Sequence, residues 1–301
     1  MTPSEVVDAV SRLKTGSRDG HRLPHKPLLV LIALGRWVRG DRGPVPFADI
    51  EGPLGQLIRT YGPNGAGNPQ DPFWRLRRDG LWELGGTAHL AAPAAVAPPG
   101  LRELRAGVTG QFTPGVRAAL AVDPTLADLL ARHVLDTHFP PSLHPDLAAA
   151  VGLDLPAEPG AVAAATPAGR RARNPEFRDR VLRAYGNRCA LCRVKLHVGL
   201  SPVAVGIEAA HIRWFAFDGP DAVTNGLALC AFHHKAFDLG AFTVEPGGRV
   251  LVSEDVNGDG ADVLLGPGPL AIEPASCAED RPAAGHLAWH RAEVFRGRVR
   301  S

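Results

Sequence analysis

Three cysteines and one histidine in the second half of the chain have the residue types and the spacing of a metal site. Cys189 and Cys192 stand in "RCALCRVKL", and Cys230 and His233 stand in "LCAFHH" with the same two-residue gap. Two such pairs about forty residues apart match a tetrahedral zinc site of three thiolates and one imidazole. A site with four protein ligands is structural, so we expect this Zn²⁺ to hold the fold. Buried cysteines without a metal are the alternative.

The histidine that follows His233 needs a separate role, because neighbouring residues on a helix point about 100° apart. His234 comes after two other residues that can do chemistry: His211, at the end of the apolar segment "GIEAAHIRW", and Asn225, in "VTNGLALC". A neutral imidazole accepts a proton from water near neutral pH, and imidazoles also bind divalent metals. His234 therefore needs a purpose other than the zinc, and His211 and Asn225 upstream are the residues to consider with it.

The run "EAAHI…NGLALC…HHKAFDLGAFTV" resembles the HNH endonucleases with a ββα-metal core, and in particular the branch found in McrA-like restriction enzymes. This resemblance implies that His211 is the general base and that Asn225 bridges loop backbone groups and orients it. It also implies that His234 binds one catalytic divalent cation, such as Mn²⁺ or Mg²⁺, which polarises the scissile phosphate. If His211 and His234 instead belong to a degenerate module, the domain binds DNA without cutting it.

The sequence departs from this family at the residue before the general base. Many HNH enzymes have an acid or a histidine there as a second metal ligand, whereas this chain has Ala210. The nearest acid, Glu208, is an odd number of residues from His211 and so points to the opposite face of a strand. We expect Glu208 to have an orienting or structural role, and to be a ligand only if the strand bends.

The first half of the chain is expected to select the target, because HNH nucleases have little sequence preference of their own. Its stretches "RLPHKPLLVLIALGR", "FADIEGPLGQLIRTYGP", "DPFWRLRRDGLWEL" and "THFPPSLHPDLAAAVGL" resemble the sulfur-binding domain of phosphorothioated-DNA-dependent restriction endonucleases. The C-terminal "LAWHRAEVFRG" extends the similarity, so it covers nearly the whole chain. The implied partner is double-stranded DNA that carries phosphorothioate.

Sulfur in place of a phosphate oxygen is larger, more polarizable and a poorer hydrogen-bond acceptor, so it calls for a shallow apolar cup beside cations. Pro72 and Phe73 are candidates for the cup, with Trp74 behind them in the core; the alternative is that Pro72 and Phe73 are only turn and core residues. The macrodipole disfavours a cation such as Lys26 at a helix start unless that end faces a phosphate. The candidate DNA and sulfur contacts are Arg18, Arg22, His25, Lys26, Pro72, Phe73, Arg75 and Arg77.

Asp71 stands where relatives commonly have tyrosine. A carboxylate beside a phosphate is unfavourable unless an arginine pairs with it, so Asp71 bears directly on sulfur recognition.

The expected fold class is α+β, with a mainly helical sulfur-binding domain at 1–153, a linker rich in Ala, Pro and Gly at 154–174, and a zinc-containing ββα-metal (HNH) nuclease domain at 175–301. Hydrophobic periodicity predicts helices at 4–14, 26–38, 47–62 and in pieces across 114–151. The segment "FWRLRRDGLWEL" predicts two strands joined by an Asp79-Gly80 turn. The nuclease domain should have a helix at 176–185, a strand at 203–210, a helix at 228–238, two strands within 241–253 and a closing helix.

Composition fits a cytoplasmic two-domain protein. The chain has 301 residues, 45% hydrophobic and 21% charged, with a net charge of only +2. Basic residues are concentrated at 12–42 and 170–183, which suits phosphate contacts and equally suits a solvated surface. The start lacks the basic and apolar regions of a secretory signal, and the longest apolar run, at 27–35, suits a buried helix and not a membrane span.

These observations predict a type IV-like restriction endonuclease. One rival is an HNH nuclease that acts on methylated or unmodified DNA, but a reader of a flipped base needs an aromatic cage, and the first half offers few free aromatics besides Tyr61. The other rival is a zinc-stabilised DNA-binding protein that does not cleave. Cutting both strands needs two active sites or two visits, so a homodimer is a further expectation.

Overall fold

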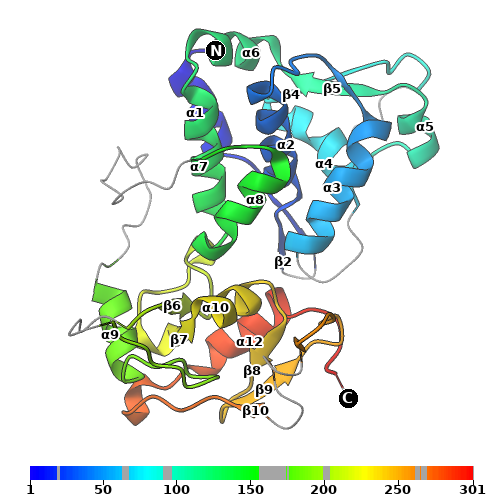
Figure 1. Ribbon diagram of the computed structural model, residues 1–301. Coiled ribbons are helices and arrows are strands. Elements are labelled where there is room, and N and C mark those ends of the chain that lie inside the picture. Colours follow the sequence, from blue (N-terminus) through cyan, green and yellow to red (C-terminus); the bar gives the residue numbers. More distant parts are fainter. Residues whose placement is uncertain are drawn as a thin grey trace. The chain divides into compact units, whose positions relative to one another are not determined.

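The computed structural model describes residues 1–18, 21–62, 68–90, 97–155, 174, 176–198, 204–261, 265 and 270–300. The chain divides into two compact units, Met1–Leu155 and Pro156–Ser301 (Figure 1). The linker expected at 154–174 lies almost wholly outside the described residues. No helix among the described residues is both long enough and apolar enough to span a bilayer.

The first unit is mainly helical around one central helix. Its described helices are α1 (Pro3–Ser11), α2 (His25–Val38), α3 (Phe47–Tyr61), α4 (Gln70–Arg75), α5 (Leu101–Arg105), α6 (Pro114–Val122), α7 (Leu126–His138) and α8 (His144–Val151). Helix α2 contacts α3, α4, α7 and α8, and it buries apolar residues on nearly every side. A helix that is hydrophobic all round has to be enclosed in this way. The helices expected in the first half are confirmed to within a few residues.

Short strands complete the first unit. The hairpin of β1 (Gly16–Arg18) and β2 (His21–Leu23) leads directly into α2. A separate antiparallel sheet has the order β3 (Val45–Pro46), β5 (Thr109–Phe112) and β4 (Trp82–Gly85). Gly110 of β5 lies under the indole of Trp82, where a Cβ atom would come within 2.5 Å of the ring. The absence of a side chain at Gly110 thus allows Trp82 to reach the core.

The expectation of two strands in "FWRLRRDGLWEL" is wrong for its first half. Residues before the turn form α4 and the 3₁₀ turn η1 (Leu76–Asp79), and only β4 is a strand. Apolar side chains at 73, 74 and 76 fit one helical face as well as a strand, and an ion pair between Asp71 and Arg75 at i, i+4 supports the helix. The expected turn is present, with Gly80 at φ 73°.

The second unit is built on a strand pair followed by a helix. Its described elements are α9 (Glu176–Ala184), β6 (Ile207–His211), η3 (Phe215–Phe217), η4 (Val223–Asn225), β7 (Gly226–Cys230), α10 (Ala231–Asp238), β8 (Phe242–Val244), β9 (Arg249–Val252), β10 (Leu270–Ala271), η5 (Ala278–Asp280) and α12 (Ala284–Glu293). Strands β6 and β7 are antiparallel, and α10 follows β7 without a loop. The predicted helix at 228–238 therefore begins later than expected, because 226–230 pairs with β6.

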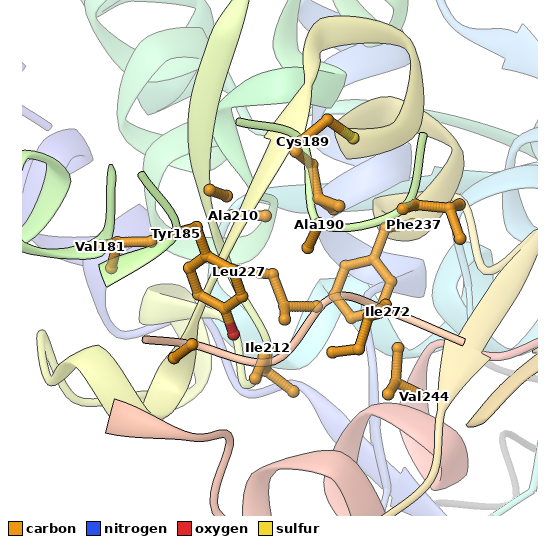
Figure 2. Close-up of a cluster of buried hydrophobic side chains, with 14 of the residues drawn as sticks. Val181, Tyr185, Cys189, Ala190, Ala210, Ile212, Leu227, Phe237, Val244 and Ile272 are labelled. Atoms are coloured by element: carbon orange, nitrogen blue, oxygen red, sulfur yellow. The ribbon is translucent and has the colours of Figure 1, made fainter. Parts of the chain in front are cut away.

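The core of this unit lies between the strand pair, α9, α10 and β8. Buried side chains from all of these elements meet there, including Val181, Leu227, Phe237 and Val244 (Figure 2). Gly226 allows α9 to approach β7 closely, since a Cβ atom at this position would lie 2.4 Å from Val181 Cγ2. The packing of α9 on the strand pair also brings Phe177 of α9 against His211 at the end of β6.

Candidate active site

Four ligand atoms, from the turn at 189–192 and from the junction of β7 with α10, form a compact cluster. The atoms belong to Cys189, Cys192, Cys230 and His233 and all lie within 4.8 Å of one another. His233 Nδ1 is 3.1 Å from Cys230 Sγ and 3.6 Å from Cys189 Sγ, and Cys192 Sγ is 3.9 Å from Cys230 Sγ. Bonds of about 2.3 Å to sulfur and about 2.0 Å to nitrogen place tetrahedral ligand atoms about 3.5–3.8 Å apart. The cluster therefore has the size of a four-ligand metal site.

The electrostatics of the cluster favour a bound cation. Burial opposes ionisation of Cys189, but hydrogen bonds from His233 and nearby backbone amides lower its pKa to about 6. Burial, together with the charges of Cys189 and Cys230, raises the pKa of Cys192 to about 12. A cation at the centre offsets the repulsion between the thiolates, so all three sulfur atoms can ionise together.

His211 ends β6 and faces two different partners. Its Nε2 atom lies 2.8 Å from Oδ1 of Asp221, in the loop between β6 and β7. Its ring stacks on Phe177 of α9, with the centroids 4.0 Å apart and an interplanar angle of 17°. The loop and the helix thus hold the imidazole at the end of the strand pair.

Asn225 is fully buried at the end of the same loop. Its Oδ1 accepts a hydrogen bond from the backbone N–H of Arg213 at 2.8 Å, and its Nδ2 donates to the carbonyls of Arg213 and Pro220, each at 2.9 Å. The Asn225 carbonyl also accepts from the N–H of Ile212, the residue after His211. The amide thus links the two ends of the loop that follows His211.

His234 lies one residue after His233 on α10 and belongs to a different cluster. Its Nδ1 is 2.7 Å from Oε2 of Glu208 on β6, and its Nε2 is 3.2 Å from Oδ2 of Asp238. Burial alone would lower the pKa of His234, but Asp238 and Glu208 raise it to about 10. Asp238 is itself buried and accepts a hydrogen bond from the indole of Trp214 at 3.0 Å. The surroundings of His234 therefore favour positive charge.

Candidate DNA contacts of the first unit meet where α2 begins and where α4 continues into η1. Lys26 Nζ donates to Asp79 Oδ2 at 2.5 Å, and 12% and 4% of the two side chains are exposed. This buried acid is the partner of the cation in the first turn of α2 in this structure, and a contact of Lys26 with phosphate stays a prediction. Burial lowers the pKa of His25, although the nearby carboxylate of Asp71 acts in the opposite direction.

The apolar cup expected at Pro72 and Phe73 is not exposed in this structure. Phe73 is fully buried, with its ring 5.1 Å from that of Phe47 and 5.8 Å from that of Trp82. Pro72 and Trp74 are buried as well. The side chain of Phe73 joins α3, α4 and β4 in the core here, so its contact with sulfur stays a prediction.

Arg75 and Arg77 are partly exposed, and both have partners on α4. Arg75 Nε donates to Asp71 at 2.9 Å, so the carboxylate has the arginine partner that a neighbouring phosphate would require. The guanidinium of Arg77 lies 4.1 Å from the ring centroid of Trp74. Arg18 and Arg22 lie on β1 and β2, and their side chains are outside the described part of the structure.

Three aspartates that partner the candidate residues were missed from the sequence. Asp238 stands four residues after His234 on one helix, so the i, i+4 rule could have identified it. Asp221 and Asp79 are brought to His211 and Lys26 by the loop and by the tertiary fold. No spacing in the sequence indicates those two contacts.

Two known family models each match one of the two compact units of the chain. Residues 3–156 match the family model described as "ScoMcrA-like, DNA sulfur-binding domain", and residues 189–245 match the family model "HNH endonuclease". No curated protein matches the chain.

Several solved structures are also similar. The sulfur-binding domain of ScoMcrA complexed with phosphorothioated DNA is 22% identical with a TM-score of 0.42, covering 49% of this chain and 94% of that chain. The corresponding SprMcrA complex is 24% identical with a TM-score of 0.42, covering 51% and 95%. The type IV phosphorothioation-dependent restriction endonuclease ScoMcrA is 20% identical with a TM-score of 0.40, covering 48% and 32%.

The family models confirm the expected fold class, with a sulfur-binding domain followed by an HNH endonuclease domain. The ββα arrangement of β6, β7 and α10 lies inside the HNH match, together with the Cys and His cluster. HNH nucleases use divalent metals, so the second unit makes the chain a metal-dependent DNA endonuclease. Because the first match spans about half of its length, the chain belongs to the family with a ScoMcrA-like DNA sulfur-binding domain, here joined to an HNH endonuclease domain.

Proposed function

We propose that this protein is a type IV restriction endonuclease that binds phosphorothioate-modified double-stranded DNA through its first unit and hydrolyses nearby phosphodiester bonds with its second. The observation that carries the proposal is the joining of a sulfur-binding domain to a site where carboxylates pair with His211 and His234 and loop backbone groups bond to Asn225. The domain limits of this proposal are 1–153, 154–174 and 175–301. Cutting both strands needs two such sites or two visits by one site, so a homodimer stays part of the proposal.

The ion held by Cys189, Cys192, Cys230 and His233 is proposed to be Zn²⁺ in a structural role. All four positions are protein ligands, and three thiolates with one imidazole suit zinc better than a harder cation. Because Cys230 is the residue before α10 and His233 lies in its first turn, the ion would fix the start of the helix that carries His234.

A single catalytic cation, Mn²⁺ or Mg²⁺, is proposed to bind at His234. Asp238 accepts a hydrogen bond from Nε2 of His234, and the other ring nitrogen, Nδ1, faces the carboxylate of Glu208. An imidazole nitrogen beside a carboxylate oxygen is a donor set that suits such a cation, and a carboxylate on the other ring nitrogen is the usual support for a metal-binding histidine. Glu208 thus takes the place that Ala210 leaves vacant in the family pattern.

His211 is proposed to accept the proton of the attacking water, while Asn225 keeps the loop behind it in one conformation. When bound, the divalent ion would polarise the scissile phosphate and stabilise the leaving oxygen. The stacked ring of Phe177 excludes solvent from one face of His211, so the imidazole meets the water in a fixed orientation.

Sulfur recognition is proposed for the surface where α2, α4 and η1 meet. His25, Arg75 and Arg77 would supply polar and cationic contacts there, together with Arg18 and Arg22 from the hairpin that precedes α2. Pro72 is buried in this structure, so it would contact the sulfur only if neighbouring side chains move and expose it. The pairing of Asp71 with Arg75 offsets the carboxylate charge next to a phosphate.

A comparison of the wild type with His211→Ala tests the proposal against a binding protein that does not cleave. Both proteins are titrated into a fluorescent duplex with one stereodefined phosphorothioate and into the same duplex without sulfur, and both are assayed for cutting with Mn²⁺. The proposal predicts equal binding and cutting by the wild type only. Equal cutting by both proteins, or none by either, would refute the assigned active site. Binding that ignores the sulfur would support the alternative of an HNH nuclease for methylated or unmodified DNA.

A further inference from the structure

The general base has a carboxylate partner that no part of the family pattern assigns. Nε2 of His211 lies 2.8 Å from Oδ1 of Asp221, with 18% and 9% of the two side chains exposed. Charge-assisted hydrogen bonds of this length are strong when the pair is shielded from water. The partner comes from the loop between β6 and β7, ten residues further along the chain.

Both members of the pair are fixed by further contacts. The other oxygen of Asp221, Oδ2, accepts a hydrogen bond from the backbone N–H of Asn174 at 2.7 Å. The His211 ring stacks on Phe177 and lies 6.0 Å from the ring of Phe215. Since a carboxylate with both oxygens engaged does not rotate freely, it presents one acceptor to one nitrogen of the ring.

This contact determines which nitrogen of His211 can act as the base. An ionised carboxylate is only an acceptor, so the nitrogen that faces it must carry the proton. A neutral imidazole has one N–H, so a proton on Nε2 leaves the lone pair on Nδ1. The other tautomer would place two lone pairs against each other across 2.8 Å.

We propose that Asp221 is a positioning residue that keeps His211 in the Nε2–H tautomer, so that Nδ1 takes the proton from the attacking water. In that step the water proton passes to Nδ1, the water oxygen bonds to phosphorus, and the bond from phosphorus to the leaving oxygen breaks. The carboxylate of Asp221 stabilises the imidazolium, which afterwards releases its proton to solvent. This inference rests on the proposed role of His211 as general base.

Asp221→Asn is the informative substitution because it keeps the shape of the side chain while it removes the charge and replaces one acceptor oxygen with an NH₂ donor. The amide has one acceptor oxygen where the carboxylate uses two, for His211 and for Asn174. If the oxygen stays on Asn174, the NH₂ group faces Nε2 and forces the proton onto Nδ1. Asp218→Asn is the matched control, since Asp218 is exposed in the same loop, loses the same charge, and has a φ of 62° that asparagine tolerates.

Two readouts on the full-length protein test the inference. In the first, ¹⁵N-histidine labelling reports the tautomer of His211, with its signal assigned by loss in His211→Ala. We expect Nε2–H in the wild type and in Asp218→Asn, and a change of tautomer in Asp221→Asn. In the second, cleavage kinetics should show kcat about 10²- to 10⁴-fold lower in Asp221→Asn, with KM for DNA within about threefold of the control.

Each other outcome overturns the inference. An Nδ1–H tautomer in the wild type would reverse the assignment of the base nitrogen. Cleavage by Asp221→Asn within about threefold of Asp218→Asn would show that Asp221 does not act through the base. A lower melting temperature with an unchanged tautomer would assign Asp221 a structural role only. If the wild type does not cut DNA, the proposed function fails, whereas the tautomer still shows whether the contact acts as described.

Discussion

Asn225→Ala should destabilise the second unit without removing a contact with the substrate, because the Asn225 side chain is buried. The change removes three hydrogen bonds of 2.8–2.9 Å at a side chain with no solvent exposure. Each such bond contributes about 1 kcal/mol net, and the backbone groups left behind in the loop cannot all be rehydrated, so the loss is about 3 kcal/mol. Asn225→Asp should cost at least as much, because a carboxylate cannot donate to the carbonyls of Arg213 and Pro220.

Calorimetry on the full chain measures this loss. The transition of the second unit is identified as the one that moves when a chelator removes the metal held by the Cys and His cluster. A loss of about 3 kcal/mol should lower its melting temperature by roughly 10 °C, since about 1 kcal/mol corresponds to 3–4 °C in a domain of this size. Asn257→Ala is the control: Asn257 is exposed and makes one bond of 2.8 Å, to the carbonyl of Asp255, so its loss should be within about 0.5 kcal/mol.

The result that refutes this reasoning is an unchanged melting temperature together with abolished cleavage. That combination would mean that Asn225 contacts the substrate and is not needed to hold the loop. A lower melting temperature with full activity at low temperature would show that the loop does not need the amide to keep His211 in place.

Further predictions concern pH, a buried charge and the metal cluster. Burial lowers the pKa of His290 from 6.5 to about 4, so the unfolded chain takes up a proton at this residue before the folded chain does as pH falls. About 3 kcal/mol of the free energy of unfolding should therefore be lost between pH 6.5 and pH 4. Denaturant titrations at several pH values should show a smaller loss in His290→Gln. Lys26→Met leaves Asp79 buried without its partner and should cost about 3–5 kcal/mol, with most of the loss recovered by adding Asp79→Asn; calorimetry of the first unit decides this. Cys192→Ser should reduce bound zinc, measured by elemental analysis, and lower the melting temperature of the second unit, whereas Cys277→Ser should leave both unchanged.

The sequence predicted the features that local spacing determines. The two Cys and His pairs, the order His211, Asn225 and His234, and the apolar helix α2 all follow from residue types at short intervals. The structure places His211 at the end of a strand and His233 and His234 on a helix, as expected, whereas Cys230 ends strand β7. Their partners are a different matter, since Asp221 reaches His211 only because a loop folds back on β6.

Errors occurred where one pattern suited two structures. The apolar residues around Phe73 fit a strand and a short helix equally, and packing against Phe47 and Trp82 favours the helix. The start of the helix expected at 228–238 was misplaced, because pairing of β7 with β6 competes with the helical preference of "LALCAF". In both segments, contacts with residues far away in the sequence determine the structure. A pattern read over about ten residues does not contain these contacts.

The most direct test of the account is a competition in one tube. Two duplexes of identical sequence carry different dyes, and only one has a single stereodefined phosphorothioate; the wild type is added with Mn²⁺ or Mg²⁺ and both products are followed. The account predicts cutting of the sulfur-bearing duplex alone, near the modification, and no cutting by His211→Ala. Equal cutting of the two duplexes would contradict it, because the first unit would then not direct the nuclease to sulfur.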